Sequence, residues 1–143
     1  MIILFIGFFV NLSNAAVWEA KIYSTVIIKD ITKLPDGSVY SNFEQTEQDT
    51  SNIGEYLISN CSGNRSDKKG ELVEIIFFCK VEVDDGNKYW TKPKRTSGDS
   101  DAGASKFKLI VGPNSFNKLK ATECKYSVSS SKNKIFGNNK ASN

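Results

Sequence analysis

Three residues of one predicted strand, Tyr89, Trp90 and Arg95, carry the side chains that a small-ligand site would need. In an extended strand Tyr89 and Arg95 point to one face, and Trp90 points to the other. An aromatic ring and a guanidinium at the mouth of a barrel could bind an anionic or amphiphilic ligand. A core tryptophan next to an arginine in a surface ion pair explains the same residues, and base rates of aromatic burial favour that interpretation.

The chain contains no histidine, and this excludes several kinds of active site. Neither a Ser-His-Asp nor a Cys-His nucleophile system can form. A zinc site built on imidazole is excluded as well, and the three cysteines lack the spacing of zinc ligands. Acid–base chemistry would have to use Asp, Glu, Lys, Tyr or Cys. The sequence therefore favours a protein without enzymatic activity, metal or cofactor.

One weak metal pattern remains in a predicted loop. Acidic and small residues alternate there in a way that is typical of the start of a calcium-binding loop: Asp99, Asp101, Gly103 and Ser105. The full calcium motif needs more acidic ligands and a distant glutamate. A solvated turn is the favoured interpretation.

The cysteines Cys61, Cys79 and Cys124 allow three pairings. A hairpin turn predicted at 67–70 brings Cys61 near residues 75–77 and makes Cys79 its diagonal neighbour. We therefore predict a Cys61–Cys79 disulfide, with Cys124 as a thiol or an alternative partner. The other interpretation is that all three are small buried hydrophobic residues.

The first residues of the chain, 1–12, are apolar and uncharged. A transmembrane helix needs roughly 20 apolar residues, so this stretch is too short to span a bilayer. Small residues at Ser13 and Ala15 predict cleavage after Ala15. We expect a signal peptide at 1–15, no transmembrane segment in the mature chain, and a secreted or periplasmic protein.

Composition and charge predict one domain at 16–130, followed by a polar and flexible tail at 131–143. The net charge is +3, and lysines alternate with acidic residues along the chain. This pattern is typical of a solvated surface. A nucleic-acid site would need a dense basic stripe, so no nucleic-acid partner is expected.

Strand signals recur along the mature chain, and helix signals are nearly absent. Strands are predicted at 18–31, 38–43, 53–61, 71–84, 88–95, 106–111 and 122–129. The polar stretch 44–52 is predicted to be a loop or an irregular edge. In the clearest strand, 71–84, the odd positions from Val73 to Val83 are predicted to face the core. The fold class is all-β: a small antiparallel meander that closes into a β-barrel or a sandwich.

A series of residues between Asn60 and Val128 resembles known proteins. It consists of Asp84-Asp85-Gly86-Asn87-Lys88-Tyr89-Trp90, Arg95, Asp101-Ala102-Gly103, Gly112, Phe116, Leu119 and Cys124-Lys125-Tyr126. The order resembles small secreted β-barrel proteins of marine bacteria with AT-rich genomes and, more distantly, allene oxide cyclase-like and lipocalin-like (calycin) barrels. The barrel relatives carry Gly-Thr-Gly where this chain has Gly112-Pro113-Asn114. The resemblance implies a calycin-like barrel, and no catalytic residue is carried over from it.

Three functions are compatible with these patterns. The favoured one is a non-enzymatic extracytoplasmic barrel that binds a small amphiphilic or anionic ligand, or another envelope component. The second is a barrel enzyme of the cyclase or isomerase kind, which needs an interior carboxyl group. Glu74 and Glu82 lie on the less apolar face of strand 71–84 and do not supply one. The third is a structural or interaction module with an exposed aromatic patch that includes Tyr40 and Phe43.

Overall fold

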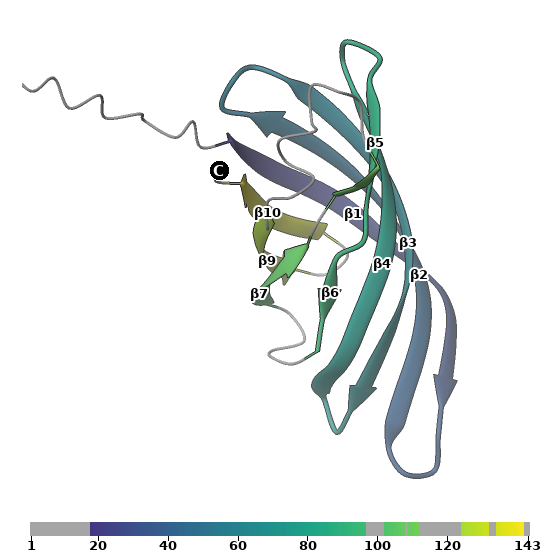
Figure 1. The fold of residues 1–143 in the computed structure, drawn as a ribbon. Coiled ribbons are helices and arrows are strands. Elements are labelled where there is room, and N and C mark those ends of the chain that lie inside the picture. Colours follow the sequence, from purple (N-terminus) through teal and green to yellow (C-terminus); the bar gives the residue numbers. More distant parts are fainter. Residues whose placement is uncertain (1–17, 97–101, 108, 112–123, 132–133, 142–143) are drawn as a thin grey trace, which may run out of the picture.

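The structure is a computed structural model that describes residues 18–96, 102–107, 109–111, 124–131 and 134–141 (Figure 1). Four long strands come first along the chain: β1 (Trp18–Lys33), β2 (Ser38–Ser51), β3 (Tyr56–Lys68) and β4 (Glu71–Val83). Six shorter strands follow: β5 (Lys88–Thr91), β6 (Lys94–Arg95), β7 (Ala102–Phe107), β8 (Leu109–Val111), β9 (Cys124–Ser131) and β10 (Lys134–Ala141). Among the described residues there is no helix long and apolar enough to cross a membrane.

The ten strands form one antiparallel sheet in the order β3-β2-β1-β10-β9-β7-β6-β4-β5-β8, and β3 also pairs with β4. Figure 1 shows the sheet curled into a half-barrel, with the long strands on one side and β6, β7, β9 and β10 facing them. The predicted all-β antiparallel meander is therefore confirmed. Because side chains alternate along each strand, every strand has a concave-face set and an outer-face set.

Tight turns connect the long strands, as the sequence predicts. The β1–β2 turn is closed by a hydrogen bond from the Leu34 amide to the Ser38 carbonyl, 2.8 Å long. The β3–β4 turn places Lys69 and Gly70 at positive φ, 54° and 85°, as a two-residue hairpin turn of the primed type requires. These turns set the register of the hairpins.

The prediction of a loop at 44–52 was wrong, because β2 continues to Ser51 and pairs with β1 on one side and β3 on the other. From Phe43 to Ser51 its side chains alternate strictly between buried and exposed, and the buried ones after Phe43 are polar: Gln45, Glu47, Asp49 and Ser51. A polar stretch carries no hydrophobic period. The two neighbouring strands instead supply the backbone hydrogen bonds that hold it extended.

The predicted face of β4 is correct from Ile75 onward and wrong at Val73. Val73 is 48% exposed, whereas Leu72 is buried. A β-bulge shifts the register between Ser66 and Asp67, which pair with Glu74 and Leu72. The extra residue in β4 reverses which side chains point to the concave face and which to the outer face. A prediction that assumes regular alternation along the strand therefore fails at that point.

Part of the predicted tail is a strand. Residues 134–141 form β10, which pairs with β1 and β9. The register joins Ile22 to Gly137, and Gly137 to Val128. An ideal Cβ atom added at Gly137 would collide with the Ser127 carbonyl, so a close approach of the two backbones favours glycine there.

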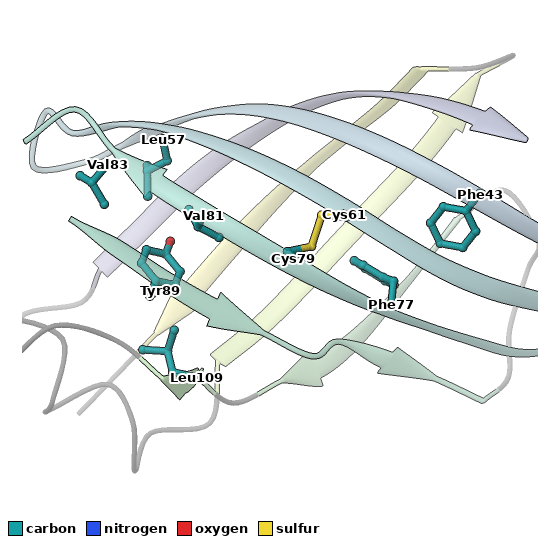
Figure 2. Packing of buried hydrophobic residues seen from close by; sticks show 9 residues of the cluster. All are labelled: Phe43, Leu57, Cys61, Phe77, Cys79, Val81, Val83, Tyr89 and Leu109. Atoms are coloured by element: carbon teal, nitrogen blue, oxygen red, sulfur yellow. A yellow bond between two sulfur atoms is a disulfide. The ribbon is translucent and has the colours of Figure 1, made fainter. Parts of the chain in front are cut away.

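The apolar core lies on the concave face of the sheet (Figure 2). It consists of Phe43, Leu57, Cys61, Phe77, Cys79, Val81, Val83, Tyr89 and Leu109. The Phe43 and Phe77 rings meet edge to face, with centroids 5.9 Å apart. This core therefore joins β2 to β5 and β8 along one wall of the half-barrel.

The β1–β2 hairpin extends past the rest of the sheet. The pairing of β1 with β10 ends at Thr25, whereas its pairing with β2 continues to Lys33. Beyond Thr25, Ile27, Ile28 and Ile31 are 56%, 46% and 60% exposed. A β-bulge interrupts this part of β1 between Ile28 and Asp30.

Candidate functional site

Two carboxyl groups lie on the concave face of β2. Glu47 and Asp49 are 8% and 6% exposed. In the register, Glu47 lies between Ser24 of β1 and Ser59 of β3. Side chains two residues apart on a strand project from the same face, so the two carboxyl groups are neighbours in the interior.

The surroundings of Glu47 are polar and organised. The Gln45 amide nitrogen donates a hydrogen bond to Glu47 Oε1 at 2.5 Å and another to Ser24 Oγ at 3.2 Å. Burial raises the pKa of Glu47 to about 7, although hydrogen bonds from Ser59 and Gln45 act in the opposite direction. Glu47 therefore titrates near neutral pH.

Asp49 has fewer partners than Glu47. Burial, together with the nearby Glu47 charge, raises the pKa of Asp49 to about 8. Its Oδ1 atom has no hydrogen-bond partner among the described residues. At neutral pH Asp49 keeps its proton, so it can offer a donor and a vacant acceptor to a group in the interior.

Tyr89 enters the same end of the concave face from β5. Its side chain is buried, and burial followed by the Asp49 and Glu55 charges strongly raises the pKa of its hydroxyl. Trp18 Nε1 donates a hydrogen bond to Glu55 Oε2 at 3.0 Å. This end of the concave face therefore combines carboxyl groups with aromatic rings.

A second polar group comes from β6. Arg95 is 7% exposed, and its Nε and Nη1 atoms have no hydrogen-bond partner within the part of the chain that the structure describes. The guanidinium lies directly over Gly103 of β7. Buried N–H donors without an acceptor are unfavourable, because they have lost water without gaining a hydrogen bond.

The Tyr126 hydroxyl lies near this arginine. It is buried, and no described residue is its hydrogen-bond partner. Burial raises the pKa of Tyr126, while the Arg95 charge and the nearby Ser105 hydroxyl lower it in part. Ser105, which pairs with Tyr126 in the register, donates its hydroxyl proton to the Lys94 carbonyl at 2.5 Å. Arg95 and Tyr126 therefore present unused donors to the same region.

The structure places the predicted ligand residues on the expected faces, but it does not bring them together. Tyr89 and Arg95 are on the concave face, and Trp90 is 40% exposed on the outer face. Tyr89 pairs with Val81 and Arg95 with Ile75 of β4. These positions are separated by roughly 20 Å of strand. The alternative of a core tryptophan and a surface arginine was wrong, because Trp90 is exposed and Arg95 is buried.

The predicted disulfide is present between Cys61 and Cys79, whose sulfur atoms are 2.03 Å apart. The two residues are directly opposite rather than diagonal, because the bulge near Ser66 advances the register. Cys124 remains a buried thiol, and burial raises its pKa to about 11. The carboxyl group of Glu47 and the two disulfide sulfurs lie within 4.8 Å of one another. Sulfurs joined in a disulfide offer no thiolate to a metal.

The remaining sequence candidates have different outcomes. Asp99 and Asp101 lie outside the described residues. Glu74 and Glu82 bind Lys94 and Lys80 at 2.5 and 2.6 Å, away from the concave face. Tyr40 is 50% exposed but Phe43 is buried, so these two residues do not form an exposed pair.

The carboxyl groups of Glu47 and Asp49 and the hydroxyl of Tyr126 were not predicted as site groups. For the carboxyl groups, the one signal in the sequence is the alternation of Gln45, Glu47, Asp49 and Ser51 with other residues, and a search for apolar periodicity does not detect it. No family model matches this chain, and the comparison with curated proteins found no match.

Proposed function

We propose that the concave face binds a small amphiphilic ligand whose anionic group is held by Arg95 and Tyr126. One observation carries this proposal. The buried side-chain atoms without a partner in the described part of the chain all belong to the concave face: Asp49 Oδ1, Arg95 Nε and Nη1, and Tyr126 Oη. Buried polar atoms in folded proteins nearly always have partners, and a ligand would supply them.

The wall between the two polar ends is suited to the apolar part of such a ligand. Phe77, the Cys61–Cys79 disulfide and Leu109 belong to the buried apolar cluster on that wall (Figure 2). An apolar body gains from leaving water, and a guanidinium binds a carboxylate or phosphate through paired hydrogen bonds. A carrier of this kind acts without cofactor or metal.

We also propose that the half-barrel closes around the ligand and that the protein works outside the cytoplasm. The pairings lead from β1 through β2, β3, β4, β6, β7, β9 and β10 back to β1. The narrowest link is the single β6–β7 pair, Lys94 with Lys106. The predicted signal peptide and the disulfide favour a secreted or periplasmic site, where disulfides persist.

Dodecanoate and dodecanol test the binding proposal, because the two molecules share an apolar chain and differ in charge. Calorimetric titration should show that dodecanoate binds more tightly. Arg95→Gln should weaken dodecanoate binding roughly 10- to 100-fold, the expected effect of losing a charged hydrogen bond. Lys92→Gln is the matched control, because it removes one positive charge from an exposed neighbour in the chain. Equal affinities for acid and alcohol would contradict the anionic subsite.

A native mass spectrum of the protein purified from a periplasmic fraction tests for the natural ligand. An additional mass that is present under native conditions and lost on denaturation would identify a bound molecule. A bare polypeptide that also fails to bind dodecanoate would remove support for the carrier function.

A second function, the acid–base enzyme, is favoured by Glu47 and Asp49. Their pKa values of about 7 and about 8 are those of groups that can both donate and accept a proton near neutral pH. The substrate would rearrange without change in mass. Glu47→Gln and Asp49→Asn should then abolish rearrangement of the recovered ligand while ligand binding persists. Identical conversion by the variants and the unchanged protein would exclude this function.

A further inference from the structure

The two polar ends of the concave face lie along one wall of the half-barrel, and the strand register fixes how far apart they are. At one end, Arg95 of β6 pairs with Ile75 of β4. At the other end, Asp49 of β2 pairs with Leu57 of β3, which in turn pairs with Val83 of β4. The stretch of β4 from Ile75 to Val83 spans roughly 26 Å at about 3.3 Å per residue.

An unbroken apolar stripe joins these two ends. The side chains of β4 that point to the concave face over this distance are all apolar: Ile75, Phe77, Cys79, Val81 and Val83. Figure 2 shows Phe77, Cys79, Val81 and Val83 following one another along the strand. A ligand that lies along this stripe therefore meets apolar side chains between a guanidinium at one end and a carboxyl group at the other.

The facing side of the half-barrel contributes a second layer of buried side chains. Ile22 of β1 and Tyr126 of β9 are buried, but neither belongs to the described apolar cluster of the β2–β5 wall. An alkyl chain that lies between the two layers would contact both and would remove apolar surface from water on both sides.

Asp49 is the group at the second end that has capacity left for a ligand. The neighbouring Glu47 carboxyl group already accepts a hydrogen bond from Gln45. Asp49 is 6% exposed, and its Oδ1 atom has no hydrogen-bond partner among the described residues. Burial and the Glu47 charge raise the pKa of Asp49 to about 8, so at neutral pH this carboxyl group offers one O–H donor and a vacant acceptor.

A hydroxyl group is the chemical complement of such a carboxyl group. It accepts one hydrogen bond and donates another, so it can pair with both oxygens of Asp49. A second carboxylate does not fit, because an anion would then be buried beside the two acidic groups of β2, Glu47 and Asp49. A methyl end would leave Asp49 Oδ1 without a partner.

The distance between the two ends sets the length of the ligand. The side chains of Arg95 and Asp49 occupy part of the roughly 26 Å between their levels, which leaves roughly 20 Å for the ligand. An extended chain advances about 1.2 Å per bond, since the three backbone bonds of one residue span about 3.5 Å. A chain of about sixteen carbon atoms therefore fills the distance, whereas a dodecanoate chain ends short of Asp49.

From these relationships we infer that the ligand is a long-chain acid with a hydroxyl group at its far end. Its carboxylate lies at Arg95, its alkyl chain follows the apolar stripe of β4, and its hydroxyl group exchanges two hydrogen bonds with Asp49. The inference rests on the proposed function, because it takes the anionic group at Arg95 as its starting point.

Four acids test the inference in calorimetric titrations in which they displace dodecanoate in mildly acidic buffer. ω-Hydroxyhexadecanoate should bind roughly three- to ten-fold more tightly than hexadecanoate, the expected effect of pairing buried polar groups. ω-Hydroxydodecanoate is the matched ligand control. Its hydroxyl group cannot reach Asp49, so it should bind no more tightly than dodecanoate itself. Hexadecanedioate should bind less tightly than ω-hydroxyhexadecanoate.

Variants of β2 assign the preference to Asp49. Asp49→Leu should abolish the preference for ω-hydroxyhexadecanoate over hexadecanoate, because leucine is of similar size and offers no hydrogen bond. Asp49→Asn should retain the preference, because an amide also donates and accepts, and this variant gives the test if Asp49→Leu does not fold. Gln48→Leu is the matched control, because it replaces a polar side chain by leucine at the adjacent exposed position. Its preference should equal that of the unchanged protein.

The outcomes separate this inference from the proposed function. Equal binding of ω-hydroxyhexadecanoate and hexadecanoate, with both weakened by Arg95→Gln, would overturn the inference and leave the anionic subsite in place. A preference that survives in Asp49→Leu, or tighter binding of hexadecanedioate, would overturn it as well. If Arg95→Gln weakened the binding of neither acid, the proposed function would fail, and the inference would fail with it.

Discussion

The guanidinium of Arg95 occupies the space that a side chain at position 103 would need, because it lies directly over Gly103 of the neighbouring strand β7. Any Cβ atom at this position would displace the guanidinium. The buried position of Arg95 on β6 therefore depends on a glycine in β7. These two strands are joined by only one residue pair.

Gly103→Ala should consequently act as an indirect Arg95 variant. We expect dodecanoate affinity to fall roughly ten-fold, since the added methyl group moves the guanidinium away from the anion. Dodecanol affinity should change little. Ala104→Ser, a small change at the exposed neighbour, is the control. Unchanged binding of dodecanoate by Gly103→Ala would show that Arg95 does not hold the anion.

Tyr126→Phe should separate stability from binding. The Tyr126 hydroxyl is buried and has no hydrogen-bond partner among the described residues, so its removal should not lower the free energy of unfolding and could raise it by about 1 kcal/mol. The same change should weaken dodecanoate binding several-fold. Urea unfolding and calorimetric titration measure the two effects. A clear loss of stability would mean that the hydroxyl has a partner within the folded chain.

Stability should fall as the pH rises from about 4 to about 8. The folded pKa values of Glu47 and Asp49, about 7 and about 8, lie above their ordinary values of 4.5 and 3.8. The folded protein therefore holds these protons more tightly than the unfolded chain, and the stabilisation present at low pH is lost through the folded pKa values. For Glu47 the difference corresponds to about 3 kcal/mol.

Glu47→Gln/Asp49→Asn should remove most of this decline, because neither amide can ionise. Urea unfolding at a series of pH values gives the comparison. Asp36→Asn is an informative control of opposite sign. Hydrogen bonds from Ser38 and Lys68 lower the pKa of Asp36 to about 2, so its contribution is present at neutral pH and lost in acid. Parallel pH profiles for the unchanged protein and the Glu47/Asp49 variant would contradict buried, protonated carboxyl groups.

Reduction of the disulfide should destabilise the protein without exposing a reactive thiol elsewhere. Cys61 and Cys79 are separated by 18 positions, and closing a loop of that size stabilises a fold by about 3 kcal/mol. Cys61→Ala/Cys79→Ala should lose a comparable free energy of unfolding. With the disulfide intact, a thiol reagent should modify Cys124 only after denaturation, because the thiol is buried and its pKa is raised. Rapid modification of the native protein would contradict that burial.

The sequence was a good guide wherever apolar residues alternate and turns carry glycine. The strands around Trp18, Phe77 and Tyr126 and the turn at 84–87 follow from these signals. Cys61 and Cys79 could be paired because one hairpin sets their register.

The sequence was a poor guide wherever a buried side chain is polar. Gln45, Glu47 and Asp49 are spaced as regularly as the buried residues of any core strand. Their side chains are polar, however, so the sequence does not predict the burial that results from the curvature of the sheet. The bulges near Ser66 and Ile28 shift faces by one residue, and no local signal fixes their positions.

The overhanging end of the β1–β2 hairpin has a consequence for colloidal behaviour. Beyond Thr25, β1 has a described neighbour on one side only, and exposed isoleucines lie along this part of the strand. Such an edge is a template for fibril growth, in which identical segments stack in register. The bulge between Ile28 and Asp30 and the charges of Lys29 and Asp30 interrupt that register. We expect this interruption to oppose the recruitment of further copies by the hairpin.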